Sequence, residues 1–150
     1  MRILKNKTPL VIEAIGRLPG PLAGNILQKH GYEVVKIENS DFPDPFSIKE
    51  GNNLSKLFNT WYKSLKQGKL EFIYEESNFH TVIDKVFSDF DISNGVILIT
   101  SSSKKPLSKI FHHLLSTMRL KNIPYKVFNI TGDESNRPIH DLDMACEIGL

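Results

Sequence analysis

The sequence has a single cysteine and no long apolar run. Cys146 is the one cysteine among 150 residues, which excludes an internal disulfide and is typical of proteins kept in a reducing compartment. No apolar stretch approaches the roughly 20 residues that a membrane-spanning helix needs. The first residues also lack the apolar segment and small-residue cleavage site of a secretory signal. We therefore expect a cytoplasmic protein that has no membrane partner.

The sequence also lacks a strong excess of either charge. It has 19 basic and 17 acidic residues, for a formal net charge of +2. Domains that bind nucleic acid usually concentrate basic charge on one face, so this balance argues against a nucleic-acid partner. The 40% hydrophobic and 24% charged content is typical of a compact globular protein. We expect residues 1–150 to form one domain.

Familiar catalytic and metal-binding motifs are absent as well. The sequence contains no C-x-x-C, H-E-x-x-H, Walker A or G-x-S-x-G pattern, and each of these would have pointed to a specific chemistry. Two adjacent histidines, His112 and His113, lie on one expected helix about 100° apart, so they cannot both face one ligand. We interpret them as a solvated or partly buried pair and expect no metal site.

Apolar segments of strand and helix character alternate along the chain. This alternation predicts an α/β fold with a doubly wound, mostly parallel, Rossmann-like sheet that has helices on both faces. The run at 95–100 is apolar throughout, which is typical of a central parallel strand. Strands are expected at residues 9–15, 33–37, 70–74, 95–100 and 124–130. Helices are expected from Pro21 to just before Gly31, over 54–65, over 79–90 and over 110–118.

The turn after the first expected strand is the first candidate ligand site. Residues 16–21 are expected to form this turn, and its backbone N–H groups would face a phosphate at the start of the next helix. The glycines are four residues apart, at 16, 20 and 24, so the G-x-G-x-x-G dinucleotide pattern is not met. Glu38 lies where the second expected strand ends and an expected loop over 38–51 begins. An acid at such a place can hold a ribose hydroxyl. The alternative is that Gly20 and Gly24 only let the helix approach the sheet closely.

Several short motifs occur in the order found in the family III CoA-transferases, the CaiB/BaiF group. That family opens with a strand, an L-A-G-P turn and a small-residue helix, and then has G-A-x-V-I-K-V-E. Later it has D-P-x, a segment ending in N-R-G-K, and R-P-G-H-D-L followed by S-G-L. The chain resembles these motifs at Leu18–Pro21, Gly31–Glu38, Asp44–Phe46, Phe58–Lys69, Arg137–Leu142 and Gly149–Leu150.

The resemblance implies a reaction and a set of site residues. Family members move CoA between carboxylic acids or epimerise α-methylacyl-CoA thioesters, so coenzyme A or an acyl-CoA is the implied substrate. The aspartate that attacks the thioester, or that moves the α-proton, corresponds to Asp141. A carboxylate is a competent nucleophile against an activated acyl group and a competent acid–base group. From the residues alone, Asp141 would be a helix N-cap or first-turn acid. The implied CoA-binding residues are Gly16, Arg17, Leu18, Pro19, Gly20, Glu38 and Lys69.

The family pattern also has parts that this sequence does not match. Family members are far longer, and two of their subunits interlock. The glycine-rich stretch of the family is reduced here to residues 131–136. The resemblance therefore implies a second copy or a separately encoded subunit that completes the site. Three hypotheses stay open: a CoA-transferase-like enzyme, a module that binds CoA or another nucleotide without chemistry, and a structural remnant.

Overall fold

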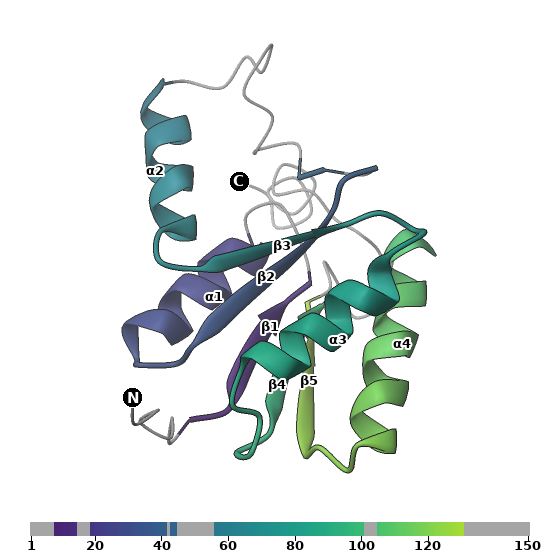
Figure 1. The fold of residues 1–150 in the computed structure, drawn as a ribbon. Coiled ribbons are helices and arrows are strands. Elements are labelled where there is room, and N and C mark those ends of the chain that lie inside the picture. The colour runs from purple at the N-terminus through teal and green to yellow at the C-terminus, as the bar shows by residue number, and fades with distance from the viewer. Residues whose placement is uncertain (1–7, 15–18, 42, 45–55, 101–104, 131–150) are drawn as a thin grey trace, which may run out of the picture.

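The computed structural model describes residues 8–14, 19–41, 43–44, 56–100 and 105–130 (Figure 1). Five strands and four helices alternate within these ranges. The strands are β1 Leu10–Glu13, β2 Val34–Asn39, β3 Leu70–Tyr74, β4 Val96–Thr100 and β5 Tyr125–Asn129. The helices are α1 Pro19–Lys29, α2 Lys56–Lys66, α3 Phe79–Asp89 and α4 Lys105–Leu120. The predicted α/β class with a parallel sheet is confirmed.

The strands form one sheet in the order β3-β2-β1-β4-β5, and every neighbouring pair is parallel. From β1 the chain builds outward through β2 to β3, and it then crosses back to add β4 and β5 on the other side of β1. Strand order therefore reverses direction between β1 and β4. Ligands of open α/β sheets bind beyond the carboxyl ends of the strands at such a switch point.

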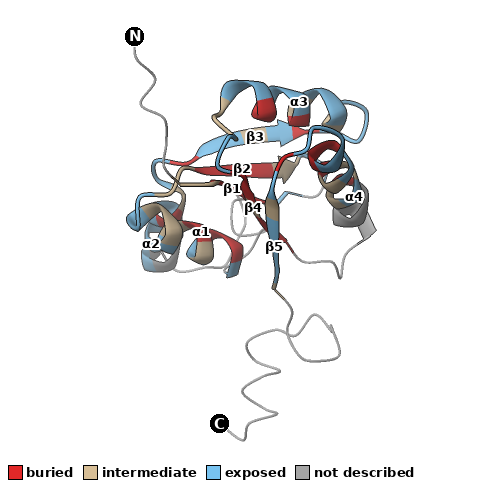
Figure 2. Ribbon diagram, turned by 90° about the horizontal axis from the view of Figure 1, so that it is seen from below, coloured by how far each residue is buried: buried red, intermediate tan, exposed pale blue. Residues whose placement is uncertain are grey.

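Helices cover both faces of the sheet. Figure 2 shows α3 and α4 on one face and α1 and α2 on the other. The larger apolar cluster lies under α3 and α4, and it includes Leu10, Ile12, Val35, Leu98 and Leu114. A smaller cluster under α1 is built on Val11, Val34 and Ile99. Successive strand residues point to opposite faces, so each strand contributes to both layers.

The helix ends lie close to where glycine predicts them. Gly31 and Gly68 follow α1 and α2 with φ angles of +85° and +79°, a conformation in which a side chain is strained. Two other expected boundaries are wrong. The turn expected over 16–21 ends earlier, because α1 already begins at Pro19, and proline's fixed φ fits the first helical turn. The loop expected over 38–51 starts later, because β2 continues through Asn39 in register with β3.

Helical spacing in the sequence predicts that Leu22, Ala23, Ile26 and Leu27 share one apolar face of the first helix, and this prediction is only half right. Ala23 and Leu27 pack against the sheet, but Leu22 and Ile26 are 37% and 49% exposed. The face in contact with the sheet instead contains three buried small or cyclic residues, Gly20, Pro21 and Gly24. The second helix differs in the same way, because Leu57 and Trp61 are exposed while Tyr62 and Leu65 are buried.

No helix in the described ranges combines the length and the apolar character that a membrane span requires.

Candidate functional site

The structure describes only some of the residues that sequence reasoning assigned to the site. Gly16, Arg17, Leu18 and Asp141 lie outside the described residues. Pro19 and Gly20 are the first two residues of α1, just beyond the carboxyl end of β1. Glu38 is in β2, and Lys69 directly precedes β3. These assignments stay predictions, and the surroundings of Glu38 and Lys69 show what those two side chains do in the fold.

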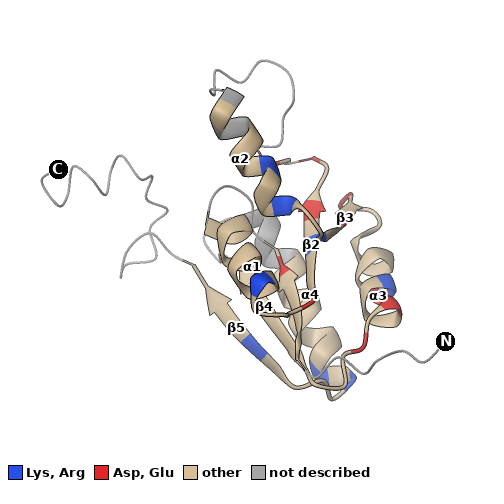
Figure 3. Cartoon of the chain, turned by 90° about the vertical axis from the view of Figure 1, so that its left-hand side faces the viewer, with Lys and Arg blue, Asp and Glu red and all other residues tan. Residues whose placement is uncertain are grey.

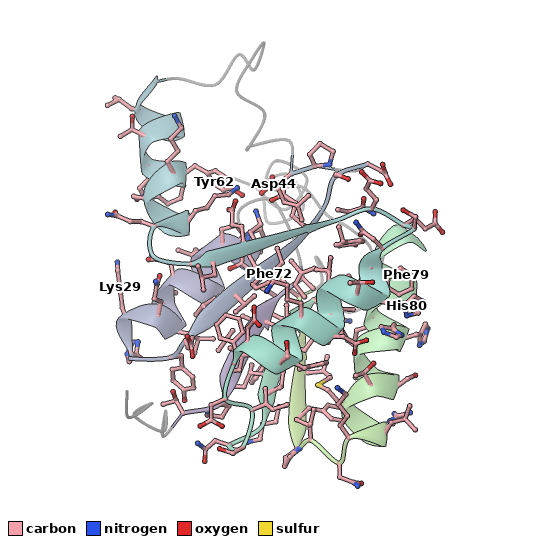
Figure 4. The ribbon with its side chains drawn as sticks, viewed as in Figure 1. Lys29, Asp44, Tyr62, Phe72, Phe79 and His80 are labelled. Atoms are coloured by element: carbon pink, nitrogen blue, oxygen red, sulfur yellow. The ribbon has the colours of Figure 1, made fainter. Side chains whose placement is uncertain are left out.

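Glu38 and Lys69 belong to a group of charged side chains between the sheet and helices α1 and α2. We call this group the buried ionic cluster. Figure 3 shows that basic and acidic residues gather where α2 meets the sheet, and Figure 4 shows Tyr62 of α2 directed towards Asp44. Its members are Glu13, Lys36, Glu38, Asp44, Tyr62, Lys66 and Lys69.

The most enclosed part of the cluster is the pair of Glu13 and Lys69. Glu13 is the last residue of β1, and its carboxylate oxygen Oε2 lies 2.7 Å from Lys69 Nζ. Both side chains are fully buried. Lys69 Nζ also donates a hydrogen bond of 2.9 Å to the backbone carbonyl of Pro21. One ammonium group therefore ties the end of β1 and the start of β3 to the first turn of α1.

Gly24 makes room for this pair. A Cβ atom at Gly24 would overlap Glu13 Oε2 and would lie 2.9 Å from Lys69 Nζ. A larger residue at this position would therefore displace the buried Glu13–Lys69 pair, and glycine allows a close approach of helix and sheet. The structure therefore supports, for Gly24, the alternative that the sequence left open.

Burial shifts the acid–base properties of both partners. Loss of solvation raises the pKa of the Glu13 carboxyl, and the nearby Lys69 charge opposes this rise. The same burial lowers the pKa of the Lys69 ammonium, against the opposing effect of Glu13. The second carboxylate oxygen, Glu13 Oε1, is buried and has no hydrogen-bond partner among the described residues. The pair therefore carries an acceptor that the described part of the protein leaves unused.

The second part of the cluster surrounds Lys36 in β2. Lys36 Nζ lies 2.8 Å from Glu38 Oε2 and 3.6 Å from Asp44 Oδ2. The Tyr62 hydroxyl donates a hydrogen bond to that same Asp44 oxygen, and the Asp44 N–H donates to Glu38 Oε1 at 2.9 Å. These contacts connect α2 and the segment after β2 to the sheet.

The charges around Lys36 also control its protonation and that of Tyr62. Burial disfavours the charged form of Lys36, but the carboxylates of Glu38 and Asp44 outweigh this effect and raise its pKa. Burial and the hydrogen bond to Asp44 raise the pKa of the Tyr62 hydroxyl far above its ordinary value. Both groups are therefore held in their protonated forms at neutral pH.

Lys66 extends the cluster towards the surface. Its ammonium lies 3.9 Å from Glu38 Oε2 and 3.4 Å from Glu71 Oε1. Burial, followed by the nearby Lys36, lowers the pKa of Lys66. Two lysines therefore share the Glu38 carboxylate, so its Oε2 atom is already engaged within the protein.

Sequence reasoning missed Glu13, Lys36 and Tyr62. A signal was present for two of them, since Glu13 and Lys36 occupy strand positions that alternate with apolar neighbours and that face the same side as Val11 and Val34. A charged residue at such a position is buried and needs a partner. No comparable signal identified Tyr62, because its partner Asp44 is 18 residues away.

Metal ligands are not part of this arrangement. No group of three or more His, Cys, Asp or Glu side chains in the described ranges is placed to hold a metal ion.

The chain resembles known proteins in fold only. No family model matches it, and no curated protein matches it. Two crystal structures of Rv3272 from Mycobacterium tuberculosis, one of them described as a hypothetical protein, share 20% sequence identity with it. Their TM-scores are 0.64 and 0.58, and each alignment covers 94% of this chain. A structure of an aspartate-to-alanine variant of Rv3272 gives 19% identity and a TM-score of 0.58. The likeness is one of fold.

The matched region is a minor part of those structures. The chain corresponds to 39% of the first Rv3272 chain and 38% of the other two. It thus spans about two fifths of the length of the solved proteins that it resembles.

Proposed function

We propose that this chain is a CoA-transferase family III-like protein. In this proposal it takes part in the transfer of CoA between carboxylic acids, or in the racemisation of an acyl-CoA. The segment of Gly16, Arg17, Leu18, Pro19 and Gly20, whose last two residues begin α1, binds the diphosphate of the coenzyme, and Asp141 carries the chemistry.

One observation carries the proposal: the candidate turn joins β1 to α1 at the switch point of the sheet. β1 has β2 on one side and β4 on the other, so the turn after β1 begins at the edge where open α/β sheets bind ligands. The first described residue after the turn, Pro19, opens an 11-residue helix, and in its first turn Gly20 and Leu22 carry backbone N–H groups whereas Pro19 and Pro21 do not. The order of motifs in the sequence supports the choice of coenzyme A among nucleotides.

The buried ionic cluster supports the proposal by fixing this helix. Lys69 links the Pro21 carbonyl in the first turn of α1 to Glu13 at the end of β1. The described residues on either side of the candidate turn are thus linked to each other, and such preorganisation lowers the entropic cost of binding. In the proposed function Lys69 therefore acts as a positioning residue for the coenzyme site, and it need not touch the ligand.

The proposed chemistry needs only a carboxylate. In the transferase reaction, an Asp141 oxygen attacks the thioester carbonyl carbon, the C–S bond breaks, and CoA leaves as the thiolate. The product on the protein is a mixed anhydride. The CoA thiolate then attacks the Asp141 carbonyl of this anhydride, which releases the donor acid and leaves Asp141 as a CoA thioester, and a second carboxylate reverses these steps and leaves as the new acyl-CoA. In the racemase reaction, the same carboxylate accepts the proton from the α-carbon, and the resulting enolate regains a proton on its opposite face.

A second candidate function is a non-catalytic module that binds CoA or another nucleotide. In this alternative the coenzyme contacts the turn without Glu38 and Lys69, because these two implied ligand contacts are engaged by Lys36, Lys66 and Glu13 inside the protein. Under this alternative the cluster only stabilises the fold. A homodimer or a complementing subunit in the cytoplasm completes the site in the first candidate and is not needed in the second.

Calorimetric titration tests coenzyme binding, which both candidates require. We expect CoA to bind more tightly than NAD or ATP, and we expect Arg17→Ala to weaken CoA binding about tenfold through loss of a charged phosphate contact. Lys29→Ala is the matched control, because Lys29 is an exposed cation at the opposite end of α1. Equal weakening in both variants, or no heat with any of the three nucleotides, contradicts coenzyme binding at this turn.

An exchange assay separates the two candidates. Labelled CoA is followed between an acyl-CoA and a free carboxylic acid, with the chain alone and with its completing subunit. The first candidate predicts turnover that is lost in Asp141→Ala and kept in Asp143→Ala, a carboxylate only two positions away. CoA binding without exchange under either condition favours the non-catalytic module.

A further inference from the structure

The described helices cover one face of the sheet only in part. α1 packs on β1, β2 and β4, and α2 lies towards the β3 edge, where Lys66 contacts Glu38 of β2 and Glu71 of β3. Figure 2 shows both helices on this face, and β5 lies at the edge of the sheet opposite β3. Within the described ranges no helix covers β5 on this side. The β4–β5 part of the face therefore lacks an outer layer.

Apolar side chains of β4 and β5 point into this uncovered part. Phe128 of β5 is the register partner of Ile99 in β4, and Ile99 belongs to the apolar cluster under α1. Register partners on neighbouring strands point to the same face of a sheet, so Phe128 points to the α1 side, where it is 56% exposed. Ile97 and Ile130 pack against the same cluster and are only partly buried.

α1 adds two exposed apolar side chains on the same side. Gln28 marks the side of α1 that faces the end of α2, because a Cβ atom at Gly68 would lie 2.6 Å from its Nε2 atom. Leu22 and Ile26 lie about 120° and about 160° around the helix from Gln28, so they point away from α2. Both are exposed. We call these two residues, together with Ile97, Phe128 and Ile130, the open apolar face.

The charges around the open apolar face are positive. α1, β4 and β5 contain two basic residues, Lys29 and Lys126, and no acidic residue. Lys126 is the register partner of Ile97, so it points to this face, and it is exposed. A segment with an apolar stripe and acidic neighbours therefore has the chemistry that complements this surface.

Residues 131–150, which follow directly after β5 and Ile130, have an apolar stripe of this kind. Four of their apolar residues recur at intervals of three and four, the spacing of one face of a helix. They are Ile139, Leu142, Cys146 and Leu150. Residues 131–138 can span up to about 28 Å, so the chain can turn back from the end of β5. A helix over 139–150 would be about 18 Å long, which is close to the length of α1.

The same segment also has the complementary charge. Among residues 131–150, Arg137 is the one Lys or Arg, and five residues are acidic. The acidic residues are Asp133, Glu134, Asp141, Asp143 and Glu147. Their excess of negative charge is opposite to that of Lys29 and Lys126.

We propose that residues 139–150 form an amphipathic helix that docks on the open apolar face. Its apolar stripe packs against Ile26 of α1 and Phe128 of β5, and its acidic residues lie near Lys126. Docking removes exposed apolar surface from water and supplies the layer that this part of the sheet lacks. The proposal concerns the packing of the chain, and it holds whether or not the protein binds coenzyme A.

Disulfide trapping in the full chain tests the docking. Cys146 is the single cysteine, so a second cysteine placed on the open apolar face can report its position. We expect Ile26→Cys or Phe128→Cys to form an intramolecular disulfide with Cys146 under mild oxidation, because bridged Cα atoms lie within about 7 Å of each other. Asp84→Cys is the control, since Asp84 is exposed on α3, on the other face of the sheet. It should cross-link roughly ten times more slowly.

Gel mobility without reductant and intact mass measure these products. A covalent dimer in place of the intramolecular bond would assign the open apolar face to a second copy of the chain. No bond in either variant, or equal rates in all three, would show that Cys146 does not lie on this face. Each of these results overturns the proposal.

Hydrogen exchange of the chain without added cysteines gives an independent test. Amides of residues 139–150 should exchange slower by roughly tenfold or more than in a free peptide of the same sequence. Leu142→Asp should remove this protection, because it places a charge in the apolar stripe. Met144→Asp should keep it, because Met144 lies about 160° around the helix from Leu142.

A charge reversal tests the electrostatic part of the docking. Lys126→Glu should speed the exchange of residues 139–150 by about two- to fivefold, whereas Lys121→Glu should leave it unchanged, since Lys121 contacts Asp84 on the other face of the sheet. Amides of 139–150 that are unprotected in the wild-type chain, or an equal loss of protection in Leu142→Asp and Met144→Asp, would contradict a docked helix.

Discussion

Glu13 and Lys69 are 56 residues apart in the sequence and 2.7 Å apart in the fold. Neither side chain has access to water, so removal of one partner leaves the other as a buried charge. We expect Lys69→Met and Glu13→Gln each to lower the free energy of unfolding by about 3–5 kcal/mol. The double variant should cost much less than the sum of the two, because it leaves no uncompensated charge. Urea denaturation measures all three, and additive losses would contradict a direct pair.

Tyr62 gives a second prediction at the residue scale, and this one depends on pH. Its pKa is raised by burial and by the hydrogen bond to Asp44. The folded state therefore holds this proton more tightly than the unfolded state does. The resulting stability is present below the ordinary tyrosine pKa of 10.0, and it is lost as the pH rises above that value.

Ultraviolet titration of tyrosine ionisation measures this effect. In the wild-type chain the Tyr62 signal should develop only as the protein unfolds at high pH, and Tyr62→Phe should remove that late component. Tyr74→Phe is a useful comparison, because burial also raises the pKa of the Tyr74 hydroxyl. Ionisation of Tyr62 near pH 10 in the intact fold would show that the contact to Asp44 does not form.

Sequence reasoning reached part of the site at this scale. It named Glu38 from its place at the end of the second expected strand and Lys69 through a resemblance, and it could not see that both charges are neutralised by partners within the protein. Glu13, the partner of Lys69, comes from β1, and Lys66, one of the partners of Glu38, comes from α2. Only the packing of the elements brings these residues together. The same limit explains why the contact between His80 of α3 and His113 of α4 was not foreseen, since it depends on how the two helices pack.

At the scale of helices and strands, the sequence predicted the type of each element well, and it predicted less well which face of a helix is buried. Strand and helix positions followed from apolar periodicity and from glycine, as Gly31 and Gly68 illustrate. The face of α1 was only half right, because helical periodicity alone assigns apolar residues to the core. Here the contact with the sheet is made largely by Gly20, Pro21 and Gly24. These residues let the helix backbone lie close to the sheet, and a pattern of apolar residues does not predict such a contact.

Gly24→Ala tests that close approach. In an isolated helix, alanine is more favourable than glycine by about 1 kcal/mol. In this protein the added Cβ would overlap Glu13 Oε2, so we expect a net loss of about 1–3 kcal/mol in the free energy of unfolding. Asn25→Ala, one position along the same helix, has no such overlap and should be neutral or slightly stabilising. A stabilising Gly24→Ala would show that α1 lies farther from the sheet.

At the scale of the whole molecule, the order of strands decides where a ligand can bind. The alternation of elements predicted a parallel sheet, but it did not specify the order β3-β2-β1-β4-β5, because strand order depends on contacts between distant segments. That order places the switch point at the carboxyl end of β1, directly before the glycine turn. Rv3272 shares this fold over about two fifths of its length.

The central claim is that the turn from Gly16 to Gly20 binds the diphosphate of coenzyme A. Amide chemical shifts in a two-dimensional ¹H–¹⁵N spectrum, recorded while CoA is added, test this most directly. The account predicts the largest shifts at the amides of Gly16, Arg17, Leu18 and Gly20, with little change at Gly31 beyond the far end of α1. Unchanged spectra, or shifts confined to regions away from the carboxyl end of β1, would contradict it.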